Sequence, residues 1–229
     1  MAWLLLYPLL FLTMYASVYL FVLQMRFPGW SPWGCVLVIF SGLVPYLGFA
    51  DAIQQGTGSL ASNAQLMRSG IFPVEQIPVK SVWVSMSGQC LLTVVLVGFF
   101  ALSGWFTPKV AALPLALLVH YLFVQGFAWI LSPLALVVKD VTHGLGLVTL
   151  LLLFISPVGF LPDMVPTAWQ PLLYLNPLAW IISLYRMCLF DRYALDAQFF
   201  AGALLYATVI FVFGYWLFKK IEMTALEYA

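Results

Sequence analysis

Charged residues are scarce in this sequence. Only 7% of its 229 residues are Asp, Glu, Lys or Arg, whereas 64% are hydrophobic. Soluble globular proteins carry about 25% charged residues, because water must solvate their surfaces. A soluble domain is therefore excluded. The nine Lys and Arg are balanced by eight Asp and Glu, so the chain also lacks the positive excess typical of nucleic-acid binding, and no nucleic-acid partner is expected.

Cysteine is scarce as well. Cys35, Cys90 and Cys188 are too few, and odd in number, to form a disulfide framework. No HExxH sequence and no Cys/His cluster occurs, so no metal site is expected. A GxSxG elbow and a Walker A sequence are also missing. We therefore expect no catalytic residues, and we do not expect this chain to bind ATP itself.

Long apolar runs without charge are abundant. A transmembrane helix needs about 20 predominantly apolar residues, and a charge at the bilayer centre costs about 2.5–3.5 kcal/mol. The runs are continuous rather than alternating, which excludes a β-barrel. We predict an all-α integral membrane protein in which the whole chain, 1–229, is one transmembrane domain. Its six spans cover roughly residues 3–24, 35–54, 82–104, 110–136, 142–160 and 198–218.

A seventh charge-free stretch, 164–185, is interrupted by Pro166, Pro171 and Pro177. An interior proline costs a helix about 3 kcal/mol, and lipid cannot pair the backbone groups that it frees. We therefore predict that residues 161–196 form a re-entrant pair of half-helices, which meet near Asn176-Pro177 and pack against protein. A seventh, kinked span is the alternative.

The longest polar stretch is 55–81. Ser62 or Asn63 can cap a short helix over Ala64–Ser69. A plain connecting loop is one interpretation. We favour a docking surface for a soluble protein, because several apolar side chains here need a partner: Leu66, Met67, Ile71 and Phe72.

The few charges give a weak orientation. With six spans, both termini lie on the same side of the membrane as the 55–81 stretch. That side carries Arg68, Lys80, Lys139, Lys219 and Lys220, and the other side carries Arg26, Lys109, Arg186 and Arg192. This bias places 55–81 in the cytoplasm. We interpret the Lys219-Lys220 pair as a membrane stop signal at the C-terminal end of the last helix, where the helix dipole favours cations.

Several short motifs occur along the chain in a characteristic order. They are Trp3–Leu10, Ser41–Tyr46, Asn63–Arg68 followed by Phe72–Pro78, Lys139–Val141, Ser156–Phe160, and Asn176–Leu178 with Tyr185-Arg186. Together they make the chain resemble the ABC-type exporter permeases for polysaccharides and polyol phosphates, which serve O-antigen, capsule and teichoic acid. The resemblance covers most of the chain, and it rests on the order and spacing of the motifs rather than on any one of them.

The resemblance implies a permease subunit that moves a lipid-linked glycan across the bacterial cytoplasmic (inner) membrane. Two such multi-pass chains would form the pore as a homodimer among membrane lipids. Two separate ABC ATPase subunits would bind ATP and Mg²⁺ on the cytoplasmic face. No cofactor is then expected on this chain.

The resemblance also implies roles for individual residues. A coupling helix in a groove of the ATPase would involve Asn63, Gln65, Leu66, Met67, Arg68, Phe72, Pro73 and Glu75. A gate near the exit would involve Pro157, Asn176, Pro177 and Arg186. Aromatic residues that could stack on the glycan are Tyr46, Phe49 and Phe154.

The sequence departs from the family in one respect. These permeases normally carry a polar, amphipathic segment before the first span, whereas apolar residues follow Met1 almost at once. Either this segment is absent or the start is shortened, and which of the two holds decides whether the ATPase interface is complete. Three other functions stay open on the sequence alone: an integral-membrane enzyme acting on lipid-linked sugars, a secondary carrier and an assembly scaffold.

Overall fold

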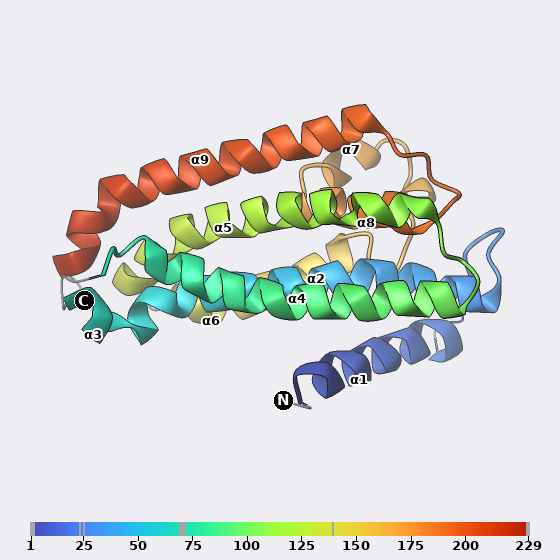
Figure 1. Cartoon of the computed structure of the whole chain (residues 1–229), viewed down its shortest axis with the longest axis horizontal. Coiled ribbons are helices and arrows are strands. Elements are labelled where there is room, and N and C mark those ends of the chain that lie inside the picture. The colour runs from blue at the N-terminus through green and yellow to red at the C-terminus, as the bar shows by residue number, and fades with distance from the viewer. Residues whose placement is uncertain (1–2, 23, 25, 69–71, 139, 228–229) are drawn as a thin grey trace. The chain divides into compact units, whose positions relative to one another are not determined.

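The computed structural model is all-helical over the residues that it describes, which are 3–22, 24, 26–68, 72–138 and 140–227. Figure 1 shows the order of the helices along the chain. They are α1 (Trp3–Ser17), the π-helix η1 (Val18–Val22), α2 (Pro32–Ser62), α3 (Ala64–Arg68), α4 (Gln76–Leu102), the 3-10 helix η2 (Pro108–Ala112), α5 (Leu113–Val137), α6 (Asp140–Ile155), the 3-10 helix η3 (Pro162–Met164), α7 (Gln170–Leu173), α8 (Pro177–Leu189) and α9 (Ala197–Glu227).

Four helical stretches in the described part of the chain are long and apolar enough to cross a membrane. They are Pro32–Ser62, Gln76–Leu102, Pro108–Val137 and Ala197–Ile221. The α1 and α6 helices have 15 and 16 residues, fewer than the roughly 20 that a full span needs. The predicted all-α membrane class is therefore confirmed at the level of four candidate spans, and the six-span topology stays a prediction.

The helices run past the limits that the charges predicted. Because α2 continues to Ser62 and α4 begins at Gln76, the connection between them covers only residues 63–75. The last turns of α2 are helical although they contain polar residues, and Ser59 there is satisfied within its own helix. Ser59 is 1% exposed, and its hydroxyl donates to the Gly56 carbonyl at 2.6 Å.

The last helix also extends further than predicted. Since α9 continues to Glu227, Lys219 and Lys220 lie inside a helix, and their interpretation as cations at its C-terminal end is wrong. Each has a nearby partner instead. Lys219 Nζ lies 2.9 Å from the carboxylate of Glu75, and Lys220 Nζ lies 5.2 Å from the centroid of the Trp216 ring.

The chain forms two compact units. The first unit comprises residues 1–47, 88–116 and 152–197, and the second comprises 48–87, 117–151 and 198–229. The helices α2, α4, α5 and α6 contribute residues to both units, and α9 contributes its first residue, Ala197, to the first unit and the rest to the second. Each unit has a core of its own and carries one of the two sites described below.

The first unit has an aromatic cluster centred on Phe190, which is 1% exposed. Its ring makes edge contacts with Trp30 and Phe100, both at 4.9 Å between centroids. Trp105 stacks on Trp30 at 5.6 Å. Each aromatic pair contributes about 0.5–1.5 kcal/mol beyond the area that it buries. The cluster therefore fixes the ends of α4 and α8 to the residues that precede α2.

The second unit has a core made by the connection after α2 together with α4, α5 and α9. Its buried members are Leu60, Met67, Val74, Ile77, Trp129 and Phe218. The α5 and α9 backbones approach closely at a glycine crossing. A Cβ added to Gly126 would lie 2.6 Å from the Ile210 carbonyl oxygen, and one on Gly214 would meet the Gly126 carbonyl. Small residues allow such close helix packing in membranes.

Candidate functional site

The first candidate site is the connection of residues 63–75 in the second unit. Asn63 joins the last turn of α2 to α3. Its Nδ2 donates to the Ser59 carbonyl at 2.8 Å, and its own carbonyl accepts from Met67 N at 3.2 Å. The α3 helix that follows corresponds to the short helix predicted over Ala64–Ser69, whose last residue lies outside the described part.

The side chains of this connection face two ways. Met67 is 2% exposed and belongs to the core, and Leu66 packs against the same core. These two residues therefore do not need a partner from outside, contrary to the prediction. Gln65 and Pro73 are exposed, and Phe72 is 37% exposed, so these three remain available to a partner. The Arg68 side chain and Ile71 lie outside the described residues.

Glu75 fastens the end of this connection to two helices. Its carboxylate pairs with Lys219 of α9, and its carbonyl accepts a hydrogen bond from Trp129 Nε1 of α5 at 3.1 Å. Partial burial acts to raise the pKa of Glu75. The hydrogen bond from Lys219, a backbone hydrogen bond and the positive charge of Lys219 outweigh this effect and lower the pKa below its ordinary value. The carboxylate is therefore held in its charged form.

The second candidate site, in the first unit, is built around Arg186, which is 3% exposed. Its Nε donates to Ser41 Oγ at 3.3 Å, and its Nη1 donates to the Phe160 carbonyl at 3.2 Å. Its Nη2 donates to the carbonyls of Val38 at 3.3 Å and Val158 at 3.2 Å. Arg186 thus joins α8 to α2 and to the non-helical segment 156–160 that follows α6.

Asn176 holds the same 156–160 segment from the start of α8. Its Oδ1 accepts from Leu178 N at 3.0 Å, which caps the helix. Its Nδ2 donates to Ser156 Oγ at 2.8 Å. Pro177 is the first residue of α8, where its missing N–H is not needed. The predicted gate residues therefore all lie in this segment or on the helix fixed to it: Pro157, Asn176, Pro177 and Arg186.

The three aromatic residues predicted to stack on a glycan differ in exposure. Tyr46 and Phe154 belong to the first unit and Phe49 to the second. Tyr46 is 6% and Phe49 4% exposed, whereas Phe154 is 61% exposed. Phe49 stacks on the His120 ring, with 6.4 Å between centroids. Within this chain only Phe154 of the three presents its ring at the surface, and the stacking role of all three stays a prediction.

The chemistry that these sites offer is hydrogen bonding and ion pairing that fix helix ends in place. Among the described residues, no three or more His, Cys, Asp or Glu side chains are grouped so that they could hold a metal ion. The sites are therefore suited to positioning helices and to contacting a partner.

Two curated relatives match almost the whole chain. Both are described as O-antigen export system permease protein RfbA from Klebsiella pneumoniae, with 25% identity over 224 residues and 24% over 223. Each alignment covers 96% of this chain and 83% of the relative. The chain is a homologue of O-antigen export permeases. No family model matches it. The resemblance predicted from the motifs is confirmed as homology along nearly its full length.

Sequence reasoning missed several residues that build the sites of this permease homologue. Ser41 and Ser156 lie inside motifs that marked the resemblance, as do their partners Arg186 and Asn176, but the motifs do not indicate which residues pair. Lys219 was missed, although it and the predicted Glu75 both flank predicted spans on the same side of the membrane, which is a signal for pairing. For Trp129, the sequence predicted only that a buried indole N–H finds an acceptor, without indicating which acceptor.

Proposed function

We propose that this chain is the membrane-spanning permease subunit of an ATP-driven exporter that moves a lipid-linked polysaccharide of the O-antigen type. Homology to O-antigen export permeases over 96% of the chain supports the proposal. The four long apolar helices support a place in the membrane, which we take to be the bacterial cytoplasmic membrane. The proposed role is transport without covalent chemistry.

In this proposal the shorter helices α1 and α6 cross the membrane as well, which gives six spans. The segment 161–196 is re-entrant, and residues 63–75 lie in the cytoplasm with both termini. Two copies of the chain form the pore, surrounded by lipid. Two ABC ATPase subunits bind ATP and Mg²⁺ and supply the energy. The observation that carries the proposal is the arrangement of residues 63–75.

This connection has the two faces that a coupling element needs. On one side it is fixed to α5 and α9 through Glu75 and the buried Met67. On the other side it exposes Gln65, Phe72 and Pro73. An ATPase that grips the exposed side would move the fixed side with it, and so would move helices that we assign to the pore.

The test is to replace the exposed side without touching the fixed side. We expect the Gln65→Ala/Phe72→Ala double variant to lose most co-purification with the ATPase and most surface glycan, while its level in the membrane stays normal. Phe213→Ala is the matched control, because Phe213 is 50% exposed on α9 and lies outside the connection. Met67→Ala should instead lower the thermal stability of the chain.

Normal export and normal ATPase binding by the double variant would contradict the coupling role. Transport that survives ATP depletion but collapses with a proton ionophore would favour a secondary carrier instead. Conversion of a lipid-linked sugar by the purified chain, without a partner, would favour an integral-membrane enzyme.

A further inference from the structure

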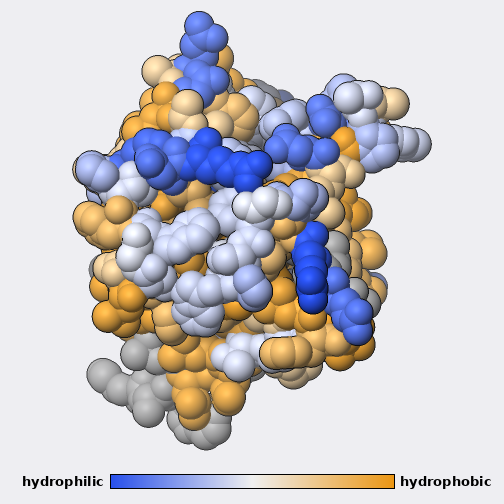
Figure 2. Space-filling model, turned by 90° about the vertical axis from the view of Figure 1, so that its right-hand side faces the viewer, coloured by the Kyte–Doolittle hydropathy of each residue, from blue (hydrophilic) through white to orange (hydrophobic). Residues whose placement is uncertain are grey.

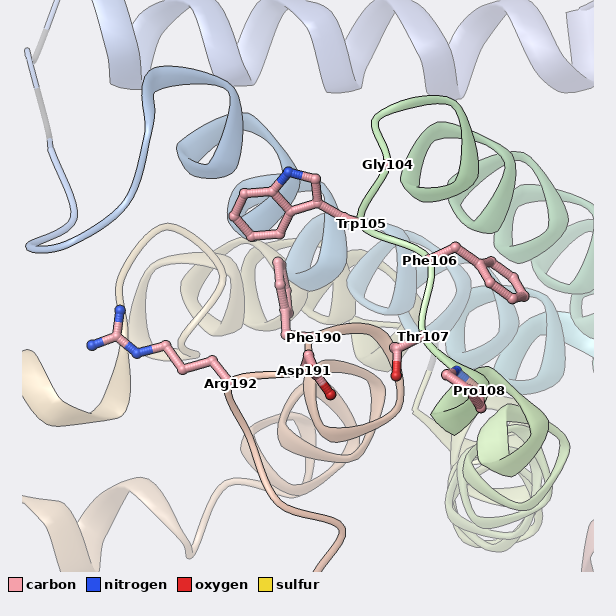
Figure 3. A pocket seen from close by; sticks show the side chains of 8 residues that line it. All are labelled: Gly104, Trp105, Phe106, Thr107, Pro108, Phe190, Asp191 and Arg192. Atoms are coloured by element: carbon pink, nitrogen blue, oxygen red, sulfur yellow. The ribbon is translucent and has the colours of Figure 1, made fainter.

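The first unit has a pocket that none of the predicted site residues lines. Its volume is about 350 Å³, within the range of about 300–1,000 Å³ typical of small-molecule sites. Figure 2 shows hydrophilic residues gathered among apolar ones on the face where α4 ends and α5 begins. The lining comes from two connections, one before η2 and one after α8 (Figure 3): Gly104, Trp105, Phe106, Thr107, Pro108, Phe190, Asp191 and Arg192.

The apolar wall of the pocket is aromatic and held in place. Trp105 stacks on Trp30 at 5.6 Å and meets the edge of the buried Phe190 at 6.2 Å. The Trp105 and Phe190 rings lie next to each other in Figure 3. Phe106 is 58% exposed, so its ring is open to a ligand. An aromatic surface that is already ordered loses little conformational entropy when a ligand binds.

The two cations at the pocket, Lys109 and Arg192, are both engaged within the protein. Lys109 uses all three of its N–H donors within the protein: on the Asp191 carboxylate at 3.1 Å, on the Asp191 carbonyl at 2.9 Å and on the Tyr193 carbonyl at 3.0 Å. Arg192 lies over the Trp30 ring at 5.5 Å. Lys109 therefore has no N–H left to offer an anionic ligand.

The polar groups of the pocket suit hydroxyl groups. The Asp191 side chain is 88% exposed although it pairs with Lys109, so it can accept further hydrogen bonds. Thr107 Oγ1 accepts from Lys109 N at 3.4 Å and keeps its own O–H as a donor. A rigid aromatic wall beside hydroxyl and carboxylate groups matches a ligand with one apolar C–H face and many hydroxyls.

We propose that this pocket binds a neutral saccharide unit of one or two rings. The C–H face of the sugar lies on the exposed Phe106 ring, since the negative face of an aromatic ring attracts polarised C–H groups. Sugar hydroxyls donate to the exposed carboxylate of Asp191. The inference rests on the proposed export function. If α4 spans the membrane once, this pocket lies on the side opposite residues 63–75, where the exported glycan leaves.

The experiment uses the purified full chain in lipid nanodiscs, without the ATPase. Saturation-transfer NMR is recorded with D-galactose, D-mannose, L-rhamnose and N-acetyl-D-glucosamine as probes. We expect transfer to the ring protons of at least one sugar, and about fivefold weaker binding for Phe106→Ala and for Asp191→Asn. Trp169→Ala is the matched control, because Trp169 is 62% exposed in the same unit and does not line the pocket.

Phe106→Ala leaves the Lys109–Asp191 pair intact, so it separates loss of the ring from loss of folding. No transfer from any of the four sugars would overturn the proposal. An equal loss in Trp169→Ala, or displacement of the sugar by inorganic phosphate, would also overturn it. If the wild-type chain binds sugar but does not restore export, the sugar site is supported and the export function is contradicted. If the chain exports without binding sugar, only the sugar site is contradicted.

Discussion

Arg186 is a buried cation whose hydrogen bonds all end on neutral oxygens. One is a hydroxyl and three are backbone carbonyls. Burial of a charge costs several kcal/mol unless its donors are satisfied. The planar guanidinium spreads five N–H donors over a wide fork, so it reaches acceptors on several segments that the compact ammonium group of lysine, with three donors, cannot all reach. Arginine is therefore required by the geometry of the site as well as by its charge.

We expect Arg186→Met and Arg186→Lys both to destabilise the protein strongly. Each buried acceptor left without a partner costs about 1–3 kcal/mol, and Val158 and Phe160 both lose theirs. The measurement is the midpoint of thermal unfolding in detergent at a fixed heating rate. Arg26→Met is the control, because Arg26 is exposed. A midpoint for Arg186→Lys equal to that of the wild type would show that charge alone is sufficient.

The Glu75–Lys219 pair makes stability depend on pH in a defined direction. Because the folded pKa of Glu75 is lowered, the pair contributes stability above the ordinary glutamate pKa. This contribution is lost as the pH falls through the lower folded pKa. We expect Glu75→Gln to be less stable than the wild type at pH 7, by roughly 1 kcal/mol or less for such a partly exposed pair. The difference should shrink as the pH falls below the ordinary glutamate pKa and vanish below the lowered folded pKa.

Neighbouring lysines provide the control for this pair. Lys219→Met should reproduce the effect of Glu75→Gln, and the double variant should add little to either. Lys220→Met should leave the pH dependence unchanged, because Lys220 contacts Trp216. Thermal unfolding between pH 3 and pH 8 tests both statements. Equal pH profiles for the wild type and Glu75→Gln would contradict the role of the pair.

At the scale of helices, the crossing of α5 and α9 depends on the absence of side chains at two positions. A Cβ at Gly126 would meet the backbone of Ile210, which cannot move away as a flexible side chain can. We expect Gly126→Ala to push the helices apart and to lower the unfolding midpoint. Gly98→Ala is the matched control, because nothing lies within 4 Å of its added Cβ, and alanine favours the helix by roughly 0.5–1 kcal/mol. A midpoint for Gly126→Ala as high as that of Gly98→Ala would contradict the close crossing.

The elements were predictable where backbone chemistry decides them. The break before Pro177 and the short helix after Asn63 follow from a missing N–H and from capping. The ends of α2 and α9 were not predictable from charge, because Ser59 and Lys219 are polar groups that the chain itself satisfies. The candidate sites were only partly predictable for the same reason, that contacts within the chain decide them. Asn176 and Arg186 were predicted, whereas the distant acceptors that define their roles have no local signal.

At the scale of the whole molecule, the decisive property is which side of the membrane each connection occupies. Residues 65 and 194 are separated by α4, α5 and α6, and three crossings place them on opposite sides. In a Cys90→Ser background, we expect Ala194→Cys to react with an impermeant maleimide in intact cells. Gln65→Cys should react only after permeabilisation. Cys35 and Cys188 are buried and should contribute little background.

Labelling of both positions from the same side would contradict the six-span topology. A seventh span in place of the re-entrant segment would leave the reaction of Gln65→Cys unchanged, but would put a cysteine placed after α9 on the side opposite to it. The same reagent on intact and opened cells therefore distinguishes the two topologies.

Glu75 is attached at two points, by its backbone to α5 and by its side chain to α9. A segment attached at one point can rotate about that point, whereas a segment attached at two points transmits both translation and rotation. Any force on residues 63–75 would therefore act on α5 and α9 together. Their close contact at the glycine crossing would make the two helices move as one. Without the ion pair, the connection would keep the Trp129 hydrogen bond and the buried Met67, so the push would still pass while control of the twist weakens.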